Sequence, residues 1–180
     1  MDPPRGDATA KHEAPEGVEV LLALGANLSD RQAAIERALA LLEADCGPLA
    51  RSSFYETPPW GDTNQPAFLN LVARGTARLA PLALLRRCKE IEHALGREPT
   101  HRWGPRAIDV DLLAYDRTVL VTPDLQLPHP RLHERGFVLV PLVEIAPEWR
   151  HPYFDRTASE LLAALPPSET AGIARWTPPA

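Results

Sequence analysis

This sequence has few cysteines, no long apolar run and no apolar stretch near its first residues. Only two cysteines, Cys46 and Cys88, occur among 180 residues, and neither a C-x-x-C pair nor a Cys/His zinc spacing is present. A disulfide scaffold and a zinc module are therefore not expected. No apolar run approaches the roughly 20 residues that cross a bilayer. Because the first residues, MDPPRGDATAKHEAPEG, lack the apolar stretch of a signal peptide, we expect a cytoplasmic protein without a membrane partner.

An excess of positive charge is also missing. Lys and Arg number 19 against 24 Asp and Glu, which gives a net charge of −5. General binding of nucleic acid needs a basic surface, so no nucleic-acid partner is expected. A site for an anion must instead be a local cluster of cations. We take a monomer as the default expectation.

The chain is long and apolar enough for one domain with a real core, since 44% of its 180 residues are hydrophobic. Residues 1–17 are rich in Pro, Gly and charge, and we expect a disordered tail there. Residues 166–180 form a second expected tail, which is Pro-rich. The single domain is expected to span residues 18–165.

Hydrophobic periodicity predicts the order β-α-β-β-α-β. Ser29 with Gln32 is a candidate capping box for the first helix, and Pro81 suits the first turn of the second, which Gly96 ends. This order is typical of an α+β fold of ferredoxin-like type, a mostly antiparallel sheet covered by helices, here with C-terminal additions. Strands are expected at 18–24, 51–57, 67–77, 107–115 and 117–122, a helix or strand at 137–146 with Pro141 in the first turn if helical, and a short helix at 159–165.

The segment RWGPRAIDVDLL, residues 102–113, places two acids inside a buried strand. Residues i and i+2 of a strand point to the same side, so Asp109 and Asp111 share one face while Leu112 faces the core. Two carboxylates this close repel each other unless a cation lies between them. Carboxylates together with phosphate oxygens are ligands that Mg²⁺ prefers, and two carboxylates can bridge a two-metal site.

Arginines gather just before this pair of acids. Arg97, Arg102 and Arg106 precede the strand, and Gly104-Pro105 fixes a turn between them and it. Guanidinium groups match phosphate with two parallel hydrogen bonds. The combination indicates a site for a magnesium nucleotide. A pair of acids facing solvent, or a structural ion-pair network, gives the same pattern, and composition and spacing do not decide between them.

The same segment closely resembles the hallmark of the 6-hydroxymethyl-7,8-dihydropterin pyrophosphokinase family of folate biosynthesis. Four further blocks follow the family's order and spacing: LALGANLSDR, SSFYETPPWG, QPAFLNLV and LPHPRLHERGFVLVPLVEIAPEW. The similarity covers roughly residues 18–152.

This resemblance implies a fold of ferredoxin-like type and an ATP-dependent pyrophosphokinase. Members of the family transfer the β,γ-pyrophosphoryl group of ATP to the hydroxymethyl oxygen of the pterin and release AMP. They use two Mg²⁺ ions. The expected partners are therefore two small molecules, ATP and 6-hydroxymethyl-7,8-dihydropterin.

The resemblance also assigns roles to particular positions. Asp109 and Asp111 are the implied metal ligands and, with Arg97 and Arg106, the implied catalytic group. The implied nucleotide contacts are Glu92, Arg102, Trp103, Arg106, Leu112, His129 and Arg135. The implied pterin contacts are Thr57, Pro58, Trp60, Phe68, Asn70 and Phe137, of which the two phenylalanines would sandwich the ring and the asparagine would bond its amide-like edge.

Other interpretations of these residues stay open from the sequence. Without the family, Phe68 and Phe137 are more often core residues, Asn70 in a strand can simply face solvent, and His129 between two prolines is by default a loop surface residue. Two rival functions are a non-catalytic module that binds pterin or nucleotide, and another Mg²⁺-dependent nucleotide transferase on a ferredoxin-like fold. The second rival needs a basic surface that the sequence does not show.

Overall fold

The structure is a computed structural model that describes residues 13–59, 63–97 and 104–178. Within these ranges no helix has the length and apolar character needed to span a membrane. The elements follow one another as β1 (Glu13–Ala26), α1 (Arg31–Cys46), β2 (Ala50–Arg51), β3 (Tyr55–Thr57), β4 (Phe68–Leu79), α2 (Pro81–Ala94), β5 (Asp109–Tyr115), β6 (Leu120–Val121), β7 (Gln126–Leu127), the 3-10 helix η1 (Leu132–Glu134), α3 (Gly136–Ile145), α4 (Ala158–Ala163), α5 (Pro167–Thr170) and β8 (Ala174–Arg175).

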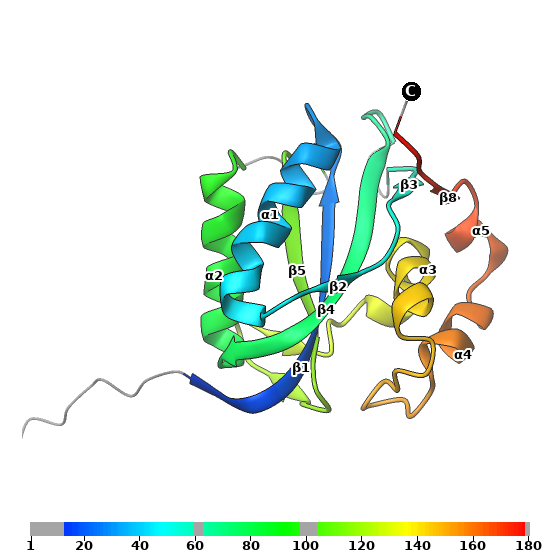
Figure 1. Cartoon of the computed structure of the whole chain (residues 1–180). Coiled ribbons are helices and arrows are strands. Elements are labelled where there is room, and N and C mark those ends of the chain that lie inside the picture. The colour runs from blue at the N-terminus through cyan, green and yellow to red at the C-terminus, as the bar shows by residue number, and fades with distance from the viewer. Residues whose placement is uncertain (1–12, 60–62, 98–103, 179–180) are drawn as a thin grey trace, which may run out of the picture.

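The main sheet has the strand order β5-β1-β4-β3-β8, and β2 pairs with β4 beside this path. Each of these pairings is antiparallel. Strands β6 and β7 form a separate two-stranded sheet. Helices α1 and α2 lie on one face of the main sheet, and α3 and α4 lie on the other (Figure 1). The predicted α+β class with a mostly antiparallel sheet is confirmed.

Both faces of the central strand β1 are buried, which explains its nearly continuous apolar run. Leu22 belongs to the core under α1 and α2, whereas its neighbour Leu21 belongs to the core under α3 and α4. Strand β4 repeats the alternation, with Leu71 on the first side and Val72 on the second. A strand covered on both faces needs apolar residues at every position rather than at every second one.

The pairing of β1 with β5 decides where the two acids point. Ala23 pairs with Asp111 and Gly25 pairs with Asp109, and the register shifts between Leu21 and Leu22. Ala23 packs against the core under α3. Leu112, on the opposite face of β5, is 3% exposed in the core under α1 and α2. Both carboxylates therefore lie on the α3 face, as the alternation predicts.

Several expected boundaries differ from the structure. Helix α1 is capped by Asp30, whose side chain accepts a hydrogen bond from the Ala33 amide at 3.0 Å, and not by Ser29, which lies at φ 53°. The predicted strand over 51–57 is divided into β2 and β3. Pro141 lies inside α3 instead of in its first turn. Helix α2 does begin at Pro81, and Gly96 follows its end at φ 88°.

Residues that were expected to form tails take part in the sheet. Strand β1 begins at Glu13 and so starts within the expected N-terminal tail. The C-terminal residues carry α5 and β8, and β8 pairs with β3. Paired backbone groups, which composition does not reveal, hold these segments in place.

Candidate active site

A cavity of about 260 Å³ opens on the α3 face at one end of the sheet. It lies where β1 ends and where β4 and β5 begin, and the start of α3 closes one side. Its lining residues are Ala23, Leu24, Gly25, Thr57, Pro58, Phe68, Asn70, Gly104, Arg106, Asp109, Asp111, His129, Arg135 and Phe137.

Most of the residues singled out from the sequence meet in this cavity. Those that line it are Thr57, Pro58, Phe68, Asn70, Arg106, Asp109, Asp111, His129, Arg135 and Phe137. Three others, Trp60, Arg102 and Trp103, lie outside the described residues. The remaining three, Glu92, Arg97 and Leu112, do not line the cavity. Segments from residue 57 to residue 137 are thus brought to one place by the fold.

Strand β1 separates the two ends of the cavity with small residues. Gly25 pairs with Asp109 on one side and with Asn70 on the other. A Cβ atom at Gly25 would lie 2.3 Å from Oδ1 of Asn70. The absence of a side chain at this position therefore makes room for the Asn70 amide, which donates to Oγ1 of Thr57 at 2.6 Å.

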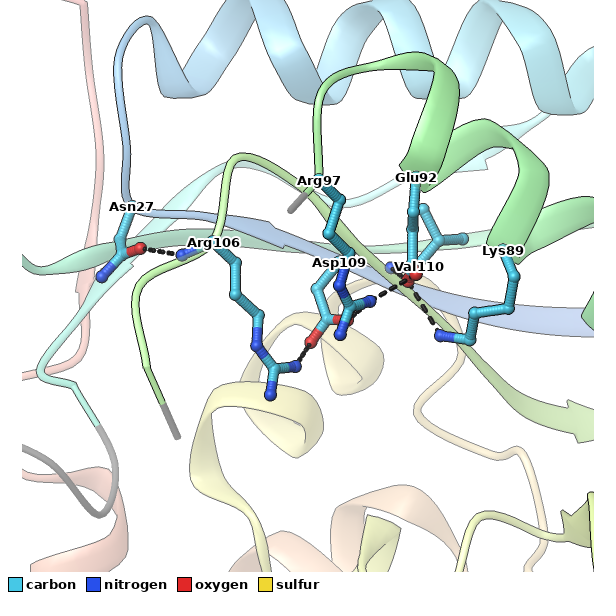
Figure 2. A network of polar contacts seen from close by, with 7 residues as sticks. All are labelled: Asn27, Lys89, Glu92, Arg97, Arg106, Asp109 and Val110. Carbon is cyan, nitrogen blue, oxygen red and sulfur yellow. Dashed lines mark hydrogen bonds and ion pairs between the residues drawn. The ribbon is translucent and has the colours of Figure 1, made fainter. Parts of the chain in front are cut away.

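Asp109 lies between two guanidinium groups (Figure 2). Its Oδ1 is 2.7 Å from Nη1 of Arg97, and its Oδ2 is 2.5 Å from Nη1 of Arg106. Burial alone would raise the pKa of the Asp109 carboxyl, but Arg106 and Arg97 lower it below its ordinary value. Asp109 is therefore ionised, and its charge is neutralised within the protein.

Asp111 has the opposite electrostatic character. Burial raises the pKa of its carboxyl to about 6, and the neighbouring charge of Asp109 adds to the rise. The two acids on one strand face thus differ in how readily they hold a proton. A cation between them would favour the ionised form of both.

Glu92 lies behind the cavity and not in its wall. Glu92 lies on α2, and only 2% of the residue is exposed to solvent. Its Oε1 accepts a hydrogen bond from the Val110 amide at 2.7 Å. It also forms ion pairs with Lys89, at 2.9 Å, and with Arg97. Glu92 therefore fixes the start of β5 and holds Arg97 against Asp109 (Figure 2). This geometry supports a positioning role, and the nucleotide contact that the resemblance implies stays a prediction.

Asn27 holds the turn that carries Arg106. The Asn27 Oδ1 accepts a hydrogen bond from the backbone amide of Arg106 at 2.8 Å. The backbone amide of Asn27 donates to the Arg106 carbonyl at 3.1 Å. Its Nδ2 donates to Gln65 at 2.9 Å and to the Pro66 carbonyl at 3.0 Å. A single side chain, 3% exposed, thus joins the loops on two sides of the cavity.

His129 enters the cavity as a neutral hydrogen-bond donor. Its amide bonds the Leu113 carbonyl at 2.7 Å, and its Nδ1 accepts from the Arg131 amide at 3.1 Å. With Nδ1 used as an acceptor, the ring proton sits on Nε2. Burial, with Arg135 adding to it, lowers the pKa of His129 to about 4. Arg135 itself lies over the ring of Phe137, 5.4 Å from its centroid.

The donor set suits a divalent cation that arrives with a phosphate. Among the residues that the structure describes, no group of three or more His, Cys, Asp and Glu side chains is arranged to hold a metal ion. Asp109 and Asp111 supply two carboxylates on one face. Mg²⁺ is commonly held by one or two carboxylates, and substrate phosphates and water supply the rest. The residues therefore fit Mg²⁺ in its nucleotide-bound form.

Some residues of the site were not found from the sequence. Three residues of β1 line the cavity, although their sequence shows only an apolar strand: Ala23, Leu24 and Gly25. Gly104, in the turn before β5, also lines it. Asn27 accepts a hydrogen bond from the Arg106 amide, and Lys89 forms an ion pair with Glu92, both outside the cavity. The spacing of Lys89 and Glu92, three apart on a helix, is the one signal that pairs these two. Leu112, in contrast, faces the core under α1 and α2 and not the cavity, and its nucleotide contact stays a prediction.

Paired acids beside guanidinium groups, with aromatic rings and an amide at the far end of the same cavity, define a phosphotransferase for a flat polar substrate. Residues 21–147 match the family model of 7,8-dihydro-6-hydroxymethylpterin-pyrophosphokinase (HPPK). The chain belongs to this family of pyrophosphokinases.

Two relatives match over most of both chains. The 2-amino-4-hydroxy-6-hydroxymethyldihydropteridine pyrophosphokinase of Methylorubrum extorquens is 47% identical over 149 residues, which are 82% of this chain and 93% of that protein. The protein of the same name from Aquifex aeolicus is 40% identical over 141 residues, 78% of this chain and 88% of that one.

Solved structures support the fold. A crystal structure of a triple mutant of Plasmodium falciparum HPPK-DHPS superposes with a TM-score of 0.69 at 18% identity. The match covers 86% of this chain and 45% of that one. The chain thus spans less than half of that longer protein.

The contact between Gly25 and Asn70 leads to a stability prediction. Gly25→Ala should lower the free energy of unfolding by about 1–3 kcal/mol, because its methyl group overlaps the Asn70 amide. Removing that amide with Asn70→Ala should recover most of the loss in the double variant. Denaturant unfolding of the four proteins measures this coupling. Additive losses would show that the two residues do not compete for space.

The raised pKa of Asp111 predicts how stability depends on pH. Its carboxyl holds a proton more tightly in the folded state than in the unfolded state, where the pKa is near 3.8. Stability from this group is therefore complete below about pH 4 and is lost as the pH rises through about 6. Asp111→Asn should stabilise the metal-free protein at pH 7–8 and have little effect near pH 4.

Denaturant unfolding with a chelator, between pH 4 and 8, tests this prediction. The control is Asp116→Asn, which changes an exposed acid on the turn after the same strand and should follow the wild-type curve. Equal behaviour of the two variants would contradict the buried setting of Asp111.

Proposed function

We propose that the chain transfers the β,γ-pyrophosphoryl group of ATP to the hydroxymethyl oxygen of 6-hydroxymethyl-7,8-dihydropterin, giving the pterin diphosphate and AMP in folate biosynthesis. The observation that carries the proposal is a single cavity with two chemically different ends on one sheet face. One end has the acids and guanidinium groups that a triphosphate needs. The other has the rings and the amide that a pterin needs. The family membership agrees with both ends.

The pterin end recognises a flat ring with a polar edge. Phe68, at the start of β4, and Phe137, at the start of α3, both line the cavity and can stack on an aromatic ring. Asn70 offers a donor and an acceptor to the ring edge, and its hydrogen bond with Thr57 fixes its orientation. A fixed amide contributes more to selection than a mobile one, because less conformational freedom is lost on binding.

The residues that we expect to bind the phosphates already form ion pairs with one another. Arg97 and Arg106 neutralise Asp109 in the free protein. When a triphosphate binds, these guanidinium groups gain a more highly charged partner, and the Asp109 oxygens become available to a metal. Neutral His129 donates from Nε2 to a phosphate oxygen, and Arg135 adds positive charge on the same side. Phosphoryl transfer requires this positioning and neutralisation more than a protein nucleophile.

Asp109 and Asp111 would hold Mg²⁺, and two ions are expected. Bound Mg²⁺ neutralises phosphate charge and helps to orient the groups that react. Glu92 and Asn27 keep the protein side of this arrangement fixed, because they tie Arg97, Arg106 and the Val110 amide in place. Action as a monomer, and in the cytoplasm, stays a prediction.

A nucleotide product assay tests the function. The full chain is mixed with ATP, Mg²⁺ and the reduced hydroxymethylpterin, and the nucleotides are separated. AMP should form in step with a pterin diphosphate and only when pterin is present. Formation of ADP would indicate an ordinary kinase. Pterin binding without nucleotide turnover would indicate the non-catalytic module.

The pair of acids predicts a loss of turnover in two variants. Asp109→Asn and Asp111→Asn should each lower kcat by on the order of 10²-fold or more, because the amide is a poor metal ligand and carries no charge. Both variants should remain folded. Asp116→Asn, the exposed acid beyond the same strand, should keep the wild-type rate. A near-normal rate for either site variant at saturating Mg²⁺ would overturn the metal-ligand assignment.

A further inference from the structure

The C-terminal residues 166–178, which we call the C-terminal strap, lie beyond the part of the chain that matches the family model. They hold α5 and β8 and run beside α3 and β3 (Figure 1). Strand β8 forms the outer edge of the main sheet in the order β5-β1-β4-β3-β8. None of the strap residues lines the cavity. Their contacts nevertheless reach β3 and the start of α3, which supply two of the walls at the pterin end.

The first contact is with β3, which ends at the cavity wall. Tyr55 and Glu56 of β3 pair with Arg175 and Ala174 of β8. The Trp176 amide donates to the Phe54 carbonyl at 2.8 Å. The Trp176 ring lies edge-on to Phe54, with 5.8 Å between the centroids. The strap therefore extends the pairing of β3 on the side away from β4.

The strap also touches the wall residue Pro58 directly. Gly172 has φ 75°, and a Cβ atom there would lie 2.8 Å from Cγ of Pro58. Pro58 and its neighbour Thr57 line the cavity, and Thr57 accepts the hydrogen bond of Asn70. A glycine at 172 thus allows the chain to pass close behind this wall.

The second contact is with the start of α3, which supplies the facing wall. A Cβ atom at Gly136 would lie 1.9 Å from the Glu169 carbonyl oxygen and 3.1 Å from Cδ1 of Ile173. Gly136 stands between Arg135 and Phe137, which both line the cavity. The strap backbone therefore rests on the turn that aims these two side chains.

A third set of contacts joins the two walls through Glu144 of α3. Its carboxylate accepts from the Ser53 amide at 3.0 Å, from the Ser53 hydroxyl at 2.8 Å and from the Tyr55 hydroxyl at 2.8 Å. Arg175 of the strap lies 3.8 Å from the same carboxylate. The strap, β3 and α3 thus form one packed unit behind the pterin end.

We propose that the C-terminal strap is a positioning element that sets the spacing between the Thr57-Pro58 wall and the Phe137 wall, and so sets the affinity for the pterin. The inference rests on the proposed function of the cavity. The nucleotide end is tied down mainly by other residues, namely Asn27, Glu92 and Lys89. Arg135 shares the turn at Gly136 with Phe137, so the selective effect on the pterin is expected of the strap contacts on the β3 side, those of Gly172 with Pro58 and of Trp176 with Phe54.

Two variants of the full chain test this selectivity. Gly172→Ala places a methyl group against Pro58, and Trp176→Ala removes the edge contact with Phe54. The control is Gly47→Ala, because Gly47 also has a positive φ, 64°, but a Cβ atom there would meet nothing within 4 Å. Trp176→Phe keeps an aromatic edge and should restore wild-type behaviour. Circular dichroism checks that each variant is folded.

Three constants are measured. The Kd of the dihydropterin is measured with Mg²⁺ and a saturating non-hydrolysable ATP analogue, and its KM is measured in the product assay. The Kd of the ATP analogue is measured separately. Gly172→Ala and Trp176→Ala should raise both pterin constants by about tenfold or more, because a small displacement of a wall is costly for a ring that fits between two walls. The Kd of the ATP analogue should stay within about twofold. The Gly47→Ala control should leave all three constants at their wild-type values.

The inference is wrong if the pterin constants are unchanged, if pterin and analogue are weakened together, or if Gly47→Ala gives the same loss. If the wild-type chain binds the ATP analogue but no pterin, the proposed function itself fails and the inference falls with it. Because binding is measured without turnover, these two failures are distinguishable.

Discussion

The carboxylate of Asp109, held between Arg97 and Arg106, is the interaction on which the rest of the site depends. A half-buried negative charge is costly unless it is paired and hydrogen-bonded. Each arginine is in turn fixed from behind, Arg97 by Glu92 and Arg106 by Asn27 acting on its backbone. The charge on one strand therefore orders a helix end, a turn and a strand start. The same cations are the ones that we propose meet the triphosphate.

The sheet supplies the second constraint. Helices cover most of both faces, and the cavity remains on the α3 face at one end of β1, where Ala23 and Gly25 have little or no side chain. Small residues at these positions keep the acids of β5 on one side and Asn70 of β4 on the other without filling the space between. The distance between a phosphate site and a ring site is in this way set by strand spacing, which is nearly invariant in sheets.

Much of the site could be predicted from the sequence because its signals are local. Alternation in β5 places Asp109 and Asp111 on one face, and the structure shows them there. The resemblance to a known family singles out eight further residues that the structure brings into the same cavity and that periodicity alone would leave scattered. Asp30 was missed as the helix cap because Ser29 and Asp30 are both good cap residues. The choice depends on where the helix begins, and because α1 begins at Arg31 the residue directly before it, Asp30, is the cap.

Long-range contacts account for what could not be predicted. Glu92 is buried because β5 offers it a backbone amide and because Arg97, beyond the end of the helix, approaches it, and its place on a helix reveals neither contact. The C-terminal residues look like a tail because proline and polarity dominate them. Their order comes from backbone pairing with β3 and from the close approach of Glu169 to Gly136 and of Gly172 to Pro58, and these contacts have no signature in composition.

We propose that Asp109 would exchange its two arginines for a metal ion when the nucleotide binds. Binding of Mn²⁺ as a probe for Mg²⁺, followed by the relaxation of water protons with and without a non-hydrolysable ATP analogue, tests it most directly. We expect weak binding of Mn²⁺ to the free protein and much tighter binding with the analogue present, and we expect this tightening to be lost in Asp109→Asn. Equally tight binding without the analogue, or full tightening in Asp109→Asn, would show that Asp109 is not a metal ligand that depends on the nucleotide.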